Sequence, residues 1–290
     1  MKKIIATSAA LLVVGSITLS PYKIDAKSFK KNESYSVEDI SNLKVFADSW
    51  DVKFKKSNSN KITISTKGKQ KDKNSVTIKR DGEDLIIKQK KTKKSGFFGG
   101  FTFGKQSGTI SISVPESEIK SIELTNKDGN IQMSKISADS IVVENNAGEE
   151  KINGISANSG KFASKDGSLN LKNSSFEELK ITSTSGDNYM KDVDSSKIKI
   201  TSKDGAVSIK NITEGESLTV KTVAGDIGLS YKKAPTSLAV SAESKSSDVK
   251  LNLDGLKKSK NTEKLKKGKI GQGVNKLSLS SGDGAINVTN

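Results

Sequence analysis

A turn glycine recurs every 19 or 20 residues in this sequence, and that period restricts the fold more than any other feature. The glycines are Gly129, Gly148, Gly167, Gly186, Gly205 and Gly225, and a later copy is Gly284. In most copies, apolar residues stand seven and five positions before the glycine and two and four positions after it. This alternation predicts two short strands per unit, each with one inward face. Glu150 and Asn188 replace the apolar residue two positions after their glycines, so we expect the stack to bend or loosen there.

A single unit has too few inward side chains to close a core of its own. Such units become stable when they stack about 4.8 Å apart, pair their backbones and continue one apolar column. We therefore predict an all-β fold, a single-stranded parallel β-solenoid of the β-helix type with rungs of about 19 residues, in which successive units stack. Each glycine is expected at a corner between two strands, in a backbone conformation with positive φ.

The repeat divides the chain into regions of different regularity. The regular solenoid is predicted for residues 121–290, with a Lys-rich insertion at 255–273. Residues 27–120 alternate less regularly, and we expect them to begin the stack and cap its first rung, because an open end exposes unpaired strand edges. A loop rich in Phe, Gly and Lys interrupts them at 92–108.

Residues 1–26 have the composition of an export signal. A basic start is followed by an almost wholly apolar run from Ile4 to Leu19 and by a small residue, Ala26. This order predicts a signal peptide cleaved after Ala26. The alternative is an uncleaved N-terminal anchor, although the run is shorter than the ~20 residues that span a bilayer. We expect the chain to be exported and either secreted or associated with the cell envelope; with no cysteine, it has neither disulfides nor a lipidated cysteine.

The composition argues against most kinds of catalysis. The chain has no histidine, which excludes imidazole bases, Ser-His pairs and the usual zinc sites. Ser-x-x-Lys matches at 117–120 and 196–199 arise by chance in a chain so rich in both residues. We predict that the protein is not an enzyme and has no cofactor or metal site. The alternative is a carbohydrate-active β-helix enzyme, which would need a groove lined with carboxylates.

The corner turns alternate between two kinds of sequence. Lys-Asp-Gly occurs at 127–129, 165–167 and 203–205, on every second unit. Like charges are then two rungs apart, or about 9.6 Å, which keeps their repulsion low. We interpret these turns as a solvated corner. The alternative is a weak calcium or sugar site along this edge, joined by Asp187 and Asp226.

Two insertions are candidate binding loops, since loops off a solenoid often carry binding residues. The first contains Lys93, Lys94, Phe97, Phe98, Phe101, Phe103 and Lys105. The second contains Lys257, Lys258, Lys260, Lys264, Lys266, Lys267 and Lys269. The Phe side chains would enter an anionic membrane or grip a partner, unless they fold back over the stack. The alternative for the second is a solvated, disordered loop that discourages edge pairing.

Positive charge is concentrated in the flanks of the sequence. Residues 53–94 hold 15 Lys or Arg and 4 acids, and residues 257–269 hold 7 Lys and 1 acid. Residues 120–230 are close to neutral, with 14 Lys and 16 acids. Nucleic acid is not an expected partner, because the chain is exported and Arg80 is its sole arginine, whereas base and phosphate readers favour Arg. The expected partners are an anionic cell-wall polymer, lipid headgroups or an envelope protein.

The motifs resemble those of a known family. An alternating strand that ends in Val-Pro, at 110–115, precedes units of the form apolar-x-apolar, polar turn, Ser/Asp-Gly, apolar-x-apolar, as at 184–187, 224–227 and 281–286. This pattern, over about residues 40–290, resembles the bacterial adhesin-like domains of unknown function built from β-strand repeats, to which LiaG-type envelope-stress proteins belong. The resemblance implies a repeat fold and an envelope location, and it transfers no catalytic residue. LiaG-type members are commonly membrane-anchored, which supports the uncleaved anchor.

These observations together predict a non-enzymatic, adhesin-like protein that binds at the cell envelope. An accessory role in envelope-stress signalling through a partner protein is an alternative, as is the carbohydrate-active enzyme. The oligomeric state is left open.

Overall fold

The structure is a computed structural model that describes residues 28–69, 75–90, 108–116 and 119–290, so the predicted export signal lies outside the described residues. The described elements are β1 (Ser28–Ser36), η1 (Val37–Asp39), β2 (Asn42–Phe46), β3 (Asp51–Lys56), β4 (Lys61–Lys69), β5 (Val76–Asp81), β6 (Asp84–Gln89), β7 (Gly108–Val114), β8 (Ser121–Asn126), β9 (Ile131–Asn145), β10 (Glu150–Ser164), β11 (Leu169–Ser183), β12 (Asn188–Ser202), β13 (Val207–Ile212), β14 (Ser217–Thr222), β15 (Ile227–Tyr231), β16 (Leu238–Ser244), β17 (Val249–Asn252), β18 (Lys257–Asn261), β19 (Leu265–Lys269), β20 (Asn275–Ser281) and β21 (Ile286–Thr289). Across these ranges, no helix is long and apolar enough to cross a membrane.

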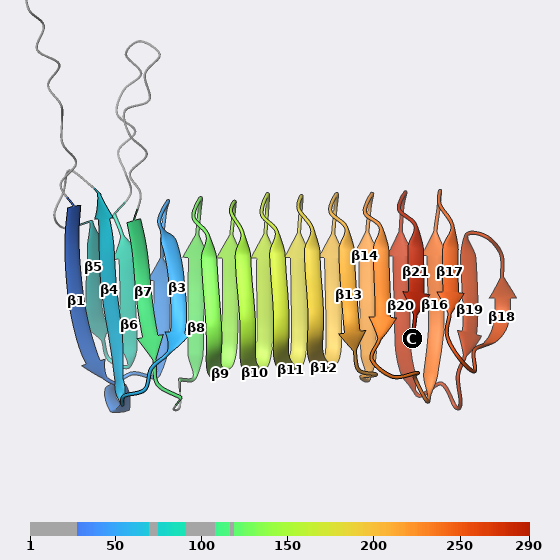
Figure 1. The fold of residues 1–290 in the computed structure, drawn as a ribbon, viewed down its shortest axis with the longest axis horizontal. Coiled ribbons are helices and arrows are strands. Elements are labelled where there is room, and N and C mark those ends of the chain that lie inside the picture. The colour runs from blue at the N-terminus through green and yellow to red at the C-terminus, as the bar shows by residue number, and fades with distance from the viewer. Residues whose placement is uncertain (1–27, 70–74, 91–107, 117–118) are drawn as a thin grey trace, which may run out of the picture.

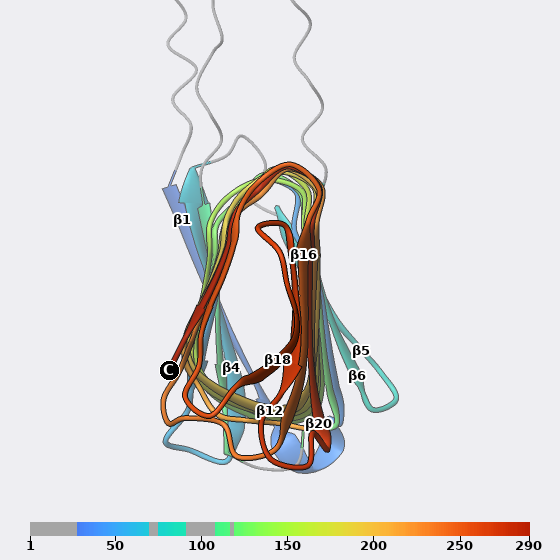
Figure 2. The same cartoon turned by 90° about the vertical axis from the view of Figure 1, so that its right-hand side faces the viewer.

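The rungs stack into a long, three-sided prism (Figure 1). Two long sides meet at the corner glycines and are closed by a short base (Figure 2). We call the side before each glycine the first wall; it contains β2, β6, β8, β14, β16, β19 and β20 and the second halves of β9–β12. The side after each glycine is the second wall; it contains β3, β7, β13, β15, β17 and β21 and the first halves of β9–β12.

The core confirms the predicted inward faces. Every apolar residue that the period assigns to the interior of residues 121–290 is buried, and one apolar column runs through the stack. The loosening expected at Glu150 is not observed, since Glu150 pairs in register with Ile131 on one side and Leu169 on the other. Backbone pairing therefore continues past a buried polar side chain, because the hydrogen bonds of the ladder do not depend on what the side chain is.

The reason given above for the corner glycines is wrong for most of them. Gly148 and Gly186 have φ of 111° and 115°, but the other five corner glycines do not have positive φ. A Cβ at Gly205 would lie 1.9 Å from the carbonyl oxygen of Gly186 one rung earlier, and the other six would meet the preceding corner carbonyl at 2.0 to 2.6 Å. The corner thus requires glycine because the rungs approach closely there, which leaves no room for a side chain.

The corner carbonyls also explain a row of hydroxyl side chains three positions before the glycine, most of them buried. Ser164 Oγ donates to the Gly167 carbonyl at 2.8 Å, and Thr222 Oγ1 donates to the Gly225 carbonyl at 2.7 Å. Ser202 makes the same contact with its own corner. A small hydroxyl residue therefore satisfies a backbone acceptor that the tight corner would otherwise leave buried and unpaired.

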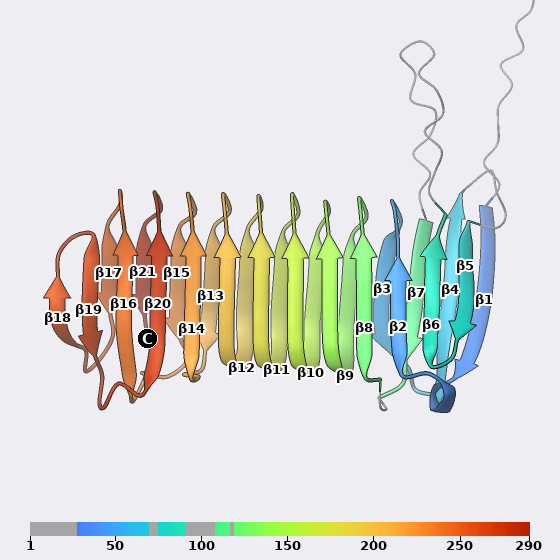
Figure 3. The same ribbon diagram turned by 180° about the vertical axis from the view of Figure 1, so that it is seen from behind.

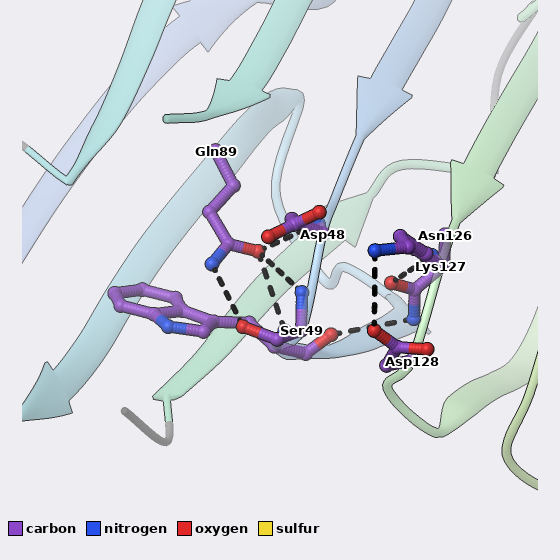
Figure 4. A network of polar contacts seen from close by, with 7 residues as sticks. Asp48, Ser49, Gln89, Asn126, Lys127 and Asp128 are labelled. Carbon is purple, nitrogen blue, oxygen red and sulfur yellow. Dashed lines mark hydrogen bonds and ion pairs between the residues drawn. The ribbon is translucent and has the colours of Figure 1, made fainter. Parts of the chain in front are cut away.

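Trp50 replaces the corner glycine in the rung formed by β2 and β3, and its indole is fully buried. The ring fits against Gly68 and Gly108, where a Cβ would lie 2.7 and 2.4 Å from ring atoms. Gln89 holds the same turn, because its side-chain oxygen accepts hydrogen bonds from the backbone N–H groups of residues 48, 49 and 50 at 2.8 to 3.3 Å (Figure 4). The large side chain fills the corner of this rung, and the apolar core continues past it into the β6–β7 rung.

The spatial order of the rungs differs from the expected stacking of successive units at both ends (Figure 3). The β2–β3 rung lies between β6–β7 and β8–β9, and the β20–β21 rung lies between β14–β15 and β16–β17. Gly284 accordingly packs on Gly225, where its Cβ would lie 2.1 Å from the carbonyl oxygen. A physical reason is that β20–β21 carries the full repeat and can fit neighbours on both sides, whereas the β16–β17 unit has no corner glycine.

Residues 255–273 do not form the loop that we expected. β18 and β19 form an antiparallel hairpin, and β19 pairs with β16. Leu253 and Ile270 are buried at its base, and Leu256 packs against the core. Lys-rich sequence obscures the strand alternation here, but the hairpin can form because these few apolar residues anchor it over the end of the core.

Candidate functional site

The two predicted binding loops have different outcomes. The candidates Lys93, Lys94, Phe97, Phe98, Phe101, Phe103 and Lys105 lie outside the described residues. The seven lysines of the second insertion all lie on the β18–β19 hairpin or its turn, six of them exposed and Lys266 half-buried. Lys266 lies on β19 and holds the turn, since its Nζ donates to Asn261 Oδ1 at 3.0 Å and to the Thr262 carbonyl at 2.9 Å.

The hairpin places positive charges directly opposite one another. Lys257 faces Lys269 across the two strands, and Lys260 faces Lys267. Directly opposed residues share a face of a sheet, and like charges in such pairs destabilise it. Among the described residues, no carboxylate forms an ion pair with these four lysines. The four ammonium groups therefore form an uncompensated cluster at one end of the first wall.

A ladder of lysines on the first wall was missed by the sequence analysis. Lys161, Lys180 and Lys199 are exposed and lie directly beside one another on β10, β11 and β12. None of the three forms an ion pair with a described carboxylate, whereas Lys197 nearby is paired with Glu178 at 3.5 Å. Each ladder lysine stands six positions before a corner glycine, so the repeat could have revealed the ladder if charges had been compared by rung.

The ladder and the hairpin belong to one basic surface. From β10 to β19 of the first wall, together with β18, the hairpin partner of β19, the outward positions hold ten lysines and two glutamates. These lysines are Lys161, Lys180, Lys197, Lys199, Lys221, Lys257, Lys260, Lys267, Lys269 and Lys276, and the glutamates are Glu178 and Glu243. Five of these lysines lie within residues 120–230 and five within residues 257–276, so the stack gathers on one wall lysines that are far apart in the sequence.

The corner acids have structural partners. Lys127, Lys165 and Lys203 each lie 3.7 to 4.0 Å from the aspartate that follows them. Asp187 Oδ1 accepts the backbone N–H of Ala206 at 2.9 Å, and Asp226 Oδ1 accepts that of Ala285 at 2.8 Å. The part of the chain that the structure describes contains no group of three or more potential acidic, His or Cys metal ligands. Asp187 and Asp226 therefore tie neighbouring rungs together at this edge, and the calcium or sugar site stays a prediction.

A groove of about 1080 Å³ runs along the base, from η1 across β9, β10 and β11. Its lining includes the small side chain of Ala157, the ring of Phe176, and the exposed carboxylates of Glu38, Asp139 and Glu177. The groove that a carbohydrate-active enzyme would need is therefore present. The acid of such an enzyme usually sits in a water-poor pocket that raises its pKa, and these three carboxylates are exposed to solvent.

Glu150 is a carboxyl inside the apolar core. Burial away from water raises its pKa to about 8. Neither of its carboxyl oxygens has a hydrogen-bond partner among the described residues, and neither does the side-chain amide of Asn145. Two rungs later, the equivalent positions hold Asn188 and Ser183, which share a hydrogen bond of 2.7 Å. Solvent and substrates cannot reach Glu150, so its role concerns stability.

The stacked walls and base define the protein as a β-solenoid. The chain belongs to the Toastrack family DUF4097, whose family model matches residues 40–289, which confirms the family resemblance drawn from the motifs. No curated protein matches the sequence.

Several solved structures are similar to this chain at low sequence identity. A "putative adhesin" from Bacteroides fragilis is 15% identical, with a TM-score of 0.56 over 91% of this chain and 99% of that chain. A "putative cell adhesion protein" from Clostridium sporogenes is 14% identical, with a TM-score of 0.31 over 91% and 99% of the two chains. A "putative lipid binding protein" from Parabacteroides distasonis is 13% identical, with a TM-score of 0.40 over 89% and 96%. At this identity, the similarity to the first establishes the fold alone.

Proposed function

We propose that this protein is a non-enzymatic binding protein of the cell envelope, exported by its N-terminal segment, and that the first wall holds a linear anionic wall polymer. The observation that carries the proposal is the unpaired ladder of Lys161, Lys180 and Lys199, continued by the hairpin.

Charge repulsion supports a polyanion as the ligand. Two ammonium groups held about 4.8 Å apart in water repel each other by about 1 kcal/mol. Side chains relieve part of this cost by spreading apart, and a row of phosphates relieves the rest. The ladder runs along the stack, so a polymer lying parallel to the long axis meets one ladder lysine on each of the three successive strands β10, β11 and β12.

Two features weigh against the enzymatic alternative. The groove carboxylates are exposed, and the buried acid Glu150 is enclosed in the core. No feature of the described surface singles out an accessory role in envelope-stress signalling, which stays a prediction.

The test compares two triple variants of the purified full chain for binding to inorganic polyphosphate over a range of salt concentrations. K161Q/K180Q/K199Q removes the ladder, and K127Q/K165Q/K203Q removes the same charge from the corner, where each lysine is paired with an aspartate. We expect the ladder variant to bind at least tenfold more weakly at low salt, with a log–log salt slope smaller by about 2, since each lost phosphate contact contributes about 0.7. Equal losses in both variants would show that net charge, and not the ladder, governs binding.

A parallel arm uses purified cell walls and vesicles of equal parts phosphatidylglycerol and phosphatidylcholine. Retention on walls that falls with salt supports the polymer. Retention on vesicles alone would assign the surface to the membrane and refute the polymer.

A further inference from the structure

The second wall is also basic, and it faces away from the first. From β3 to β17, its outward positions hold seven lysines and one acid, Asp51. These lysines are Lys53, Lys55, Lys151, Lys172, Lys191, Lys210 and Lys250. Two of the lysines have ion-pair partners at the edges of the wall, since Lys151 lies 2.8 Å from Glu149 and Lys191 lies 4.0 Å from Asp192. The net charge summed along the sequence does not reveal this wall either, because its exposed lysines alternate with buried residues.

A second ladder crosses the middle of this wall. Lys172, Lys191 and Lys210 lie directly beside one another on β11, β12 and β13. The Nζ atoms of Lys172 and Lys210 lie 5.3 and 5.7 Å from the centre of the Tyr189 ring. An aromatic face attracts ammonium groups at such distances, so the ring holds two of the three charges in place. Lys191 lies 4.0 Å from Asp192.

The two ladders are separate surfaces. Along the apex, Lys127, Lys165 and Lys203 are each balanced by an adjacent aspartate. Along the base, the groove lining carries Asp139 and Glu177. In the view down the stack, the first wall with β16 and β20 lies on the right, and the second wall, which β4 extends by pairing with β7, lies on the left (Figure 2). A neutral edge and an acidic side therefore divide two basic walls that point in opposite directions.

We infer that one molecule binds two strands of the anionic polymer at once, one on each wall, and thereby cross-links them. The inference rests on the proposed function and deepens it. Opposed walls suit separate strands, because a chain that wrapped from one wall to the other would have to cross the acidic base or the apex. They suit a membrane less, since a flat bilayer meets one wall at a time.

The first experiment is agglutination of polyphosphate-coated beads by the full chain, with size-exclusion chromatography to establish that the protein is a monomer. The variants are K161Q/K180Q/K199Q for the first wall and K172Q/K191Q/K210Q for the second, with the corner triple as the control. We expect each wall variant to sediment with the beads at low salt and to lose agglutination at least tenfold, while the control agglutinates like the wild type. A second-wall variant with full agglutination would overturn the inference.

Stoichiometry is the second measurement and does not depend on beads. Calorimetric titration with short polyphosphate should give two binding sites per chain for the wild type and one for each wall variant. One site in the wild type would overturn cross-linking and leave the proposed function standing, whereas no binding at all would refute both. The Tyr189 ring is tested separately. Tyr189→Leu should weaken binding at the second wall several-fold, whereas Tyr189→Phe should bind like the wild type, because phenylalanine keeps the aromatic face.

Discussion

Glu150 makes the stability of the solenoid depend on pH in a direction that can be calculated. Its pKa rises from 4.5 to about 8 in the folded protein because burial penalises the charged form. Well below pH 4.5 the folded and unfolded states are both protonated, and the group costs nothing. As the pH rises toward 8, the unfolded state ionises while the folded state keeps its proton, so stability falls. From this pKa the loss is about 3 kcal/mol at pH 7 and about 5 kcal/mol above pH 9, where it levels off.

Glu150→Gln removes the ionisation and keeps the shape of the side chain. We expect the variant's advantage in unfolding free energy over the wild type to grow by roughly 3 to 4 kcal/mol from pH 5 to pH 8. The measurement is urea-induced unfolding at pH 5, 6, 7 and 8, because other titrating groups contribute equally to both proteins and cancel in the difference. Glu177→Gln, which changes an exposed carboxylate on the base, is the matched control and should show no such gain. Parallel pH profiles for the wild type and Glu150→Gln would refute the reasoning.

The remaining predictions also concern stability and use urea unfolding. Gly205→Ala should destabilise the protein by several kcal/mol, because its Cβ would lie 1.9 Å from the Gly186 carbonyl oxygen. The control Gly228→Ala should be neutral or slightly stabilising, because no atom lies within 4 Å of the added Cβ. Equal effects of the two substitutions would contradict the close approach at the corner. Trp50→Ala should cost about 3 to 5 kcal/mol by opening a cavity at the first rung, and a loss under 1 kcal/mol would show that the indole is not part of the core. Asn145→Ser should stabilise by about 1 to 2 kcal/mol, since a hydroxyl at this row reaches the corner carbonyl and the unpaired amide is removed; destabilisation would indicate a partner for that amide.

The repeat predicted the interior well because one physical rule governs every rung. Ile122 and Leu124 face inward for the same reason as Leu277 and Leu279, so a period of two suffices to place them. The period does not say why Gly205 is glycine, since a residue with positive φ and a residue under a close carbonyl look the same in a sequence.

The rung order and the basic walls were harder to predict for different reasons. β20–β21 matches the repeat as well as β14–β15 does, so local pattern cannot tell which neighbour each unit will choose. The ladder of Lys161, Lys180 and Lys199 was present in the sequence, but charge was summed along the chain, where acids of the base cancel lysines of the wall. Trp50 and Gln89 act together across 39 residues, a pairing that no local pattern reveals.

The position of the β20–β21 rung also determines when the protein can finish folding. β20 and β21 leave the ribosome, and any export channel, after β16 to β19, yet they fill the place between β14–β15 and β16–β17. A stack that grew strictly from one end would put β16 against β14 first and would have to open again to admit them. We therefore expect β16 to β19 to remain undocked until β20 has arrived, which makes closure of this end a late, single event. Once closed, the final strands are held on both sides, so the stack cannot unravel from that end one rung at a time in chain order.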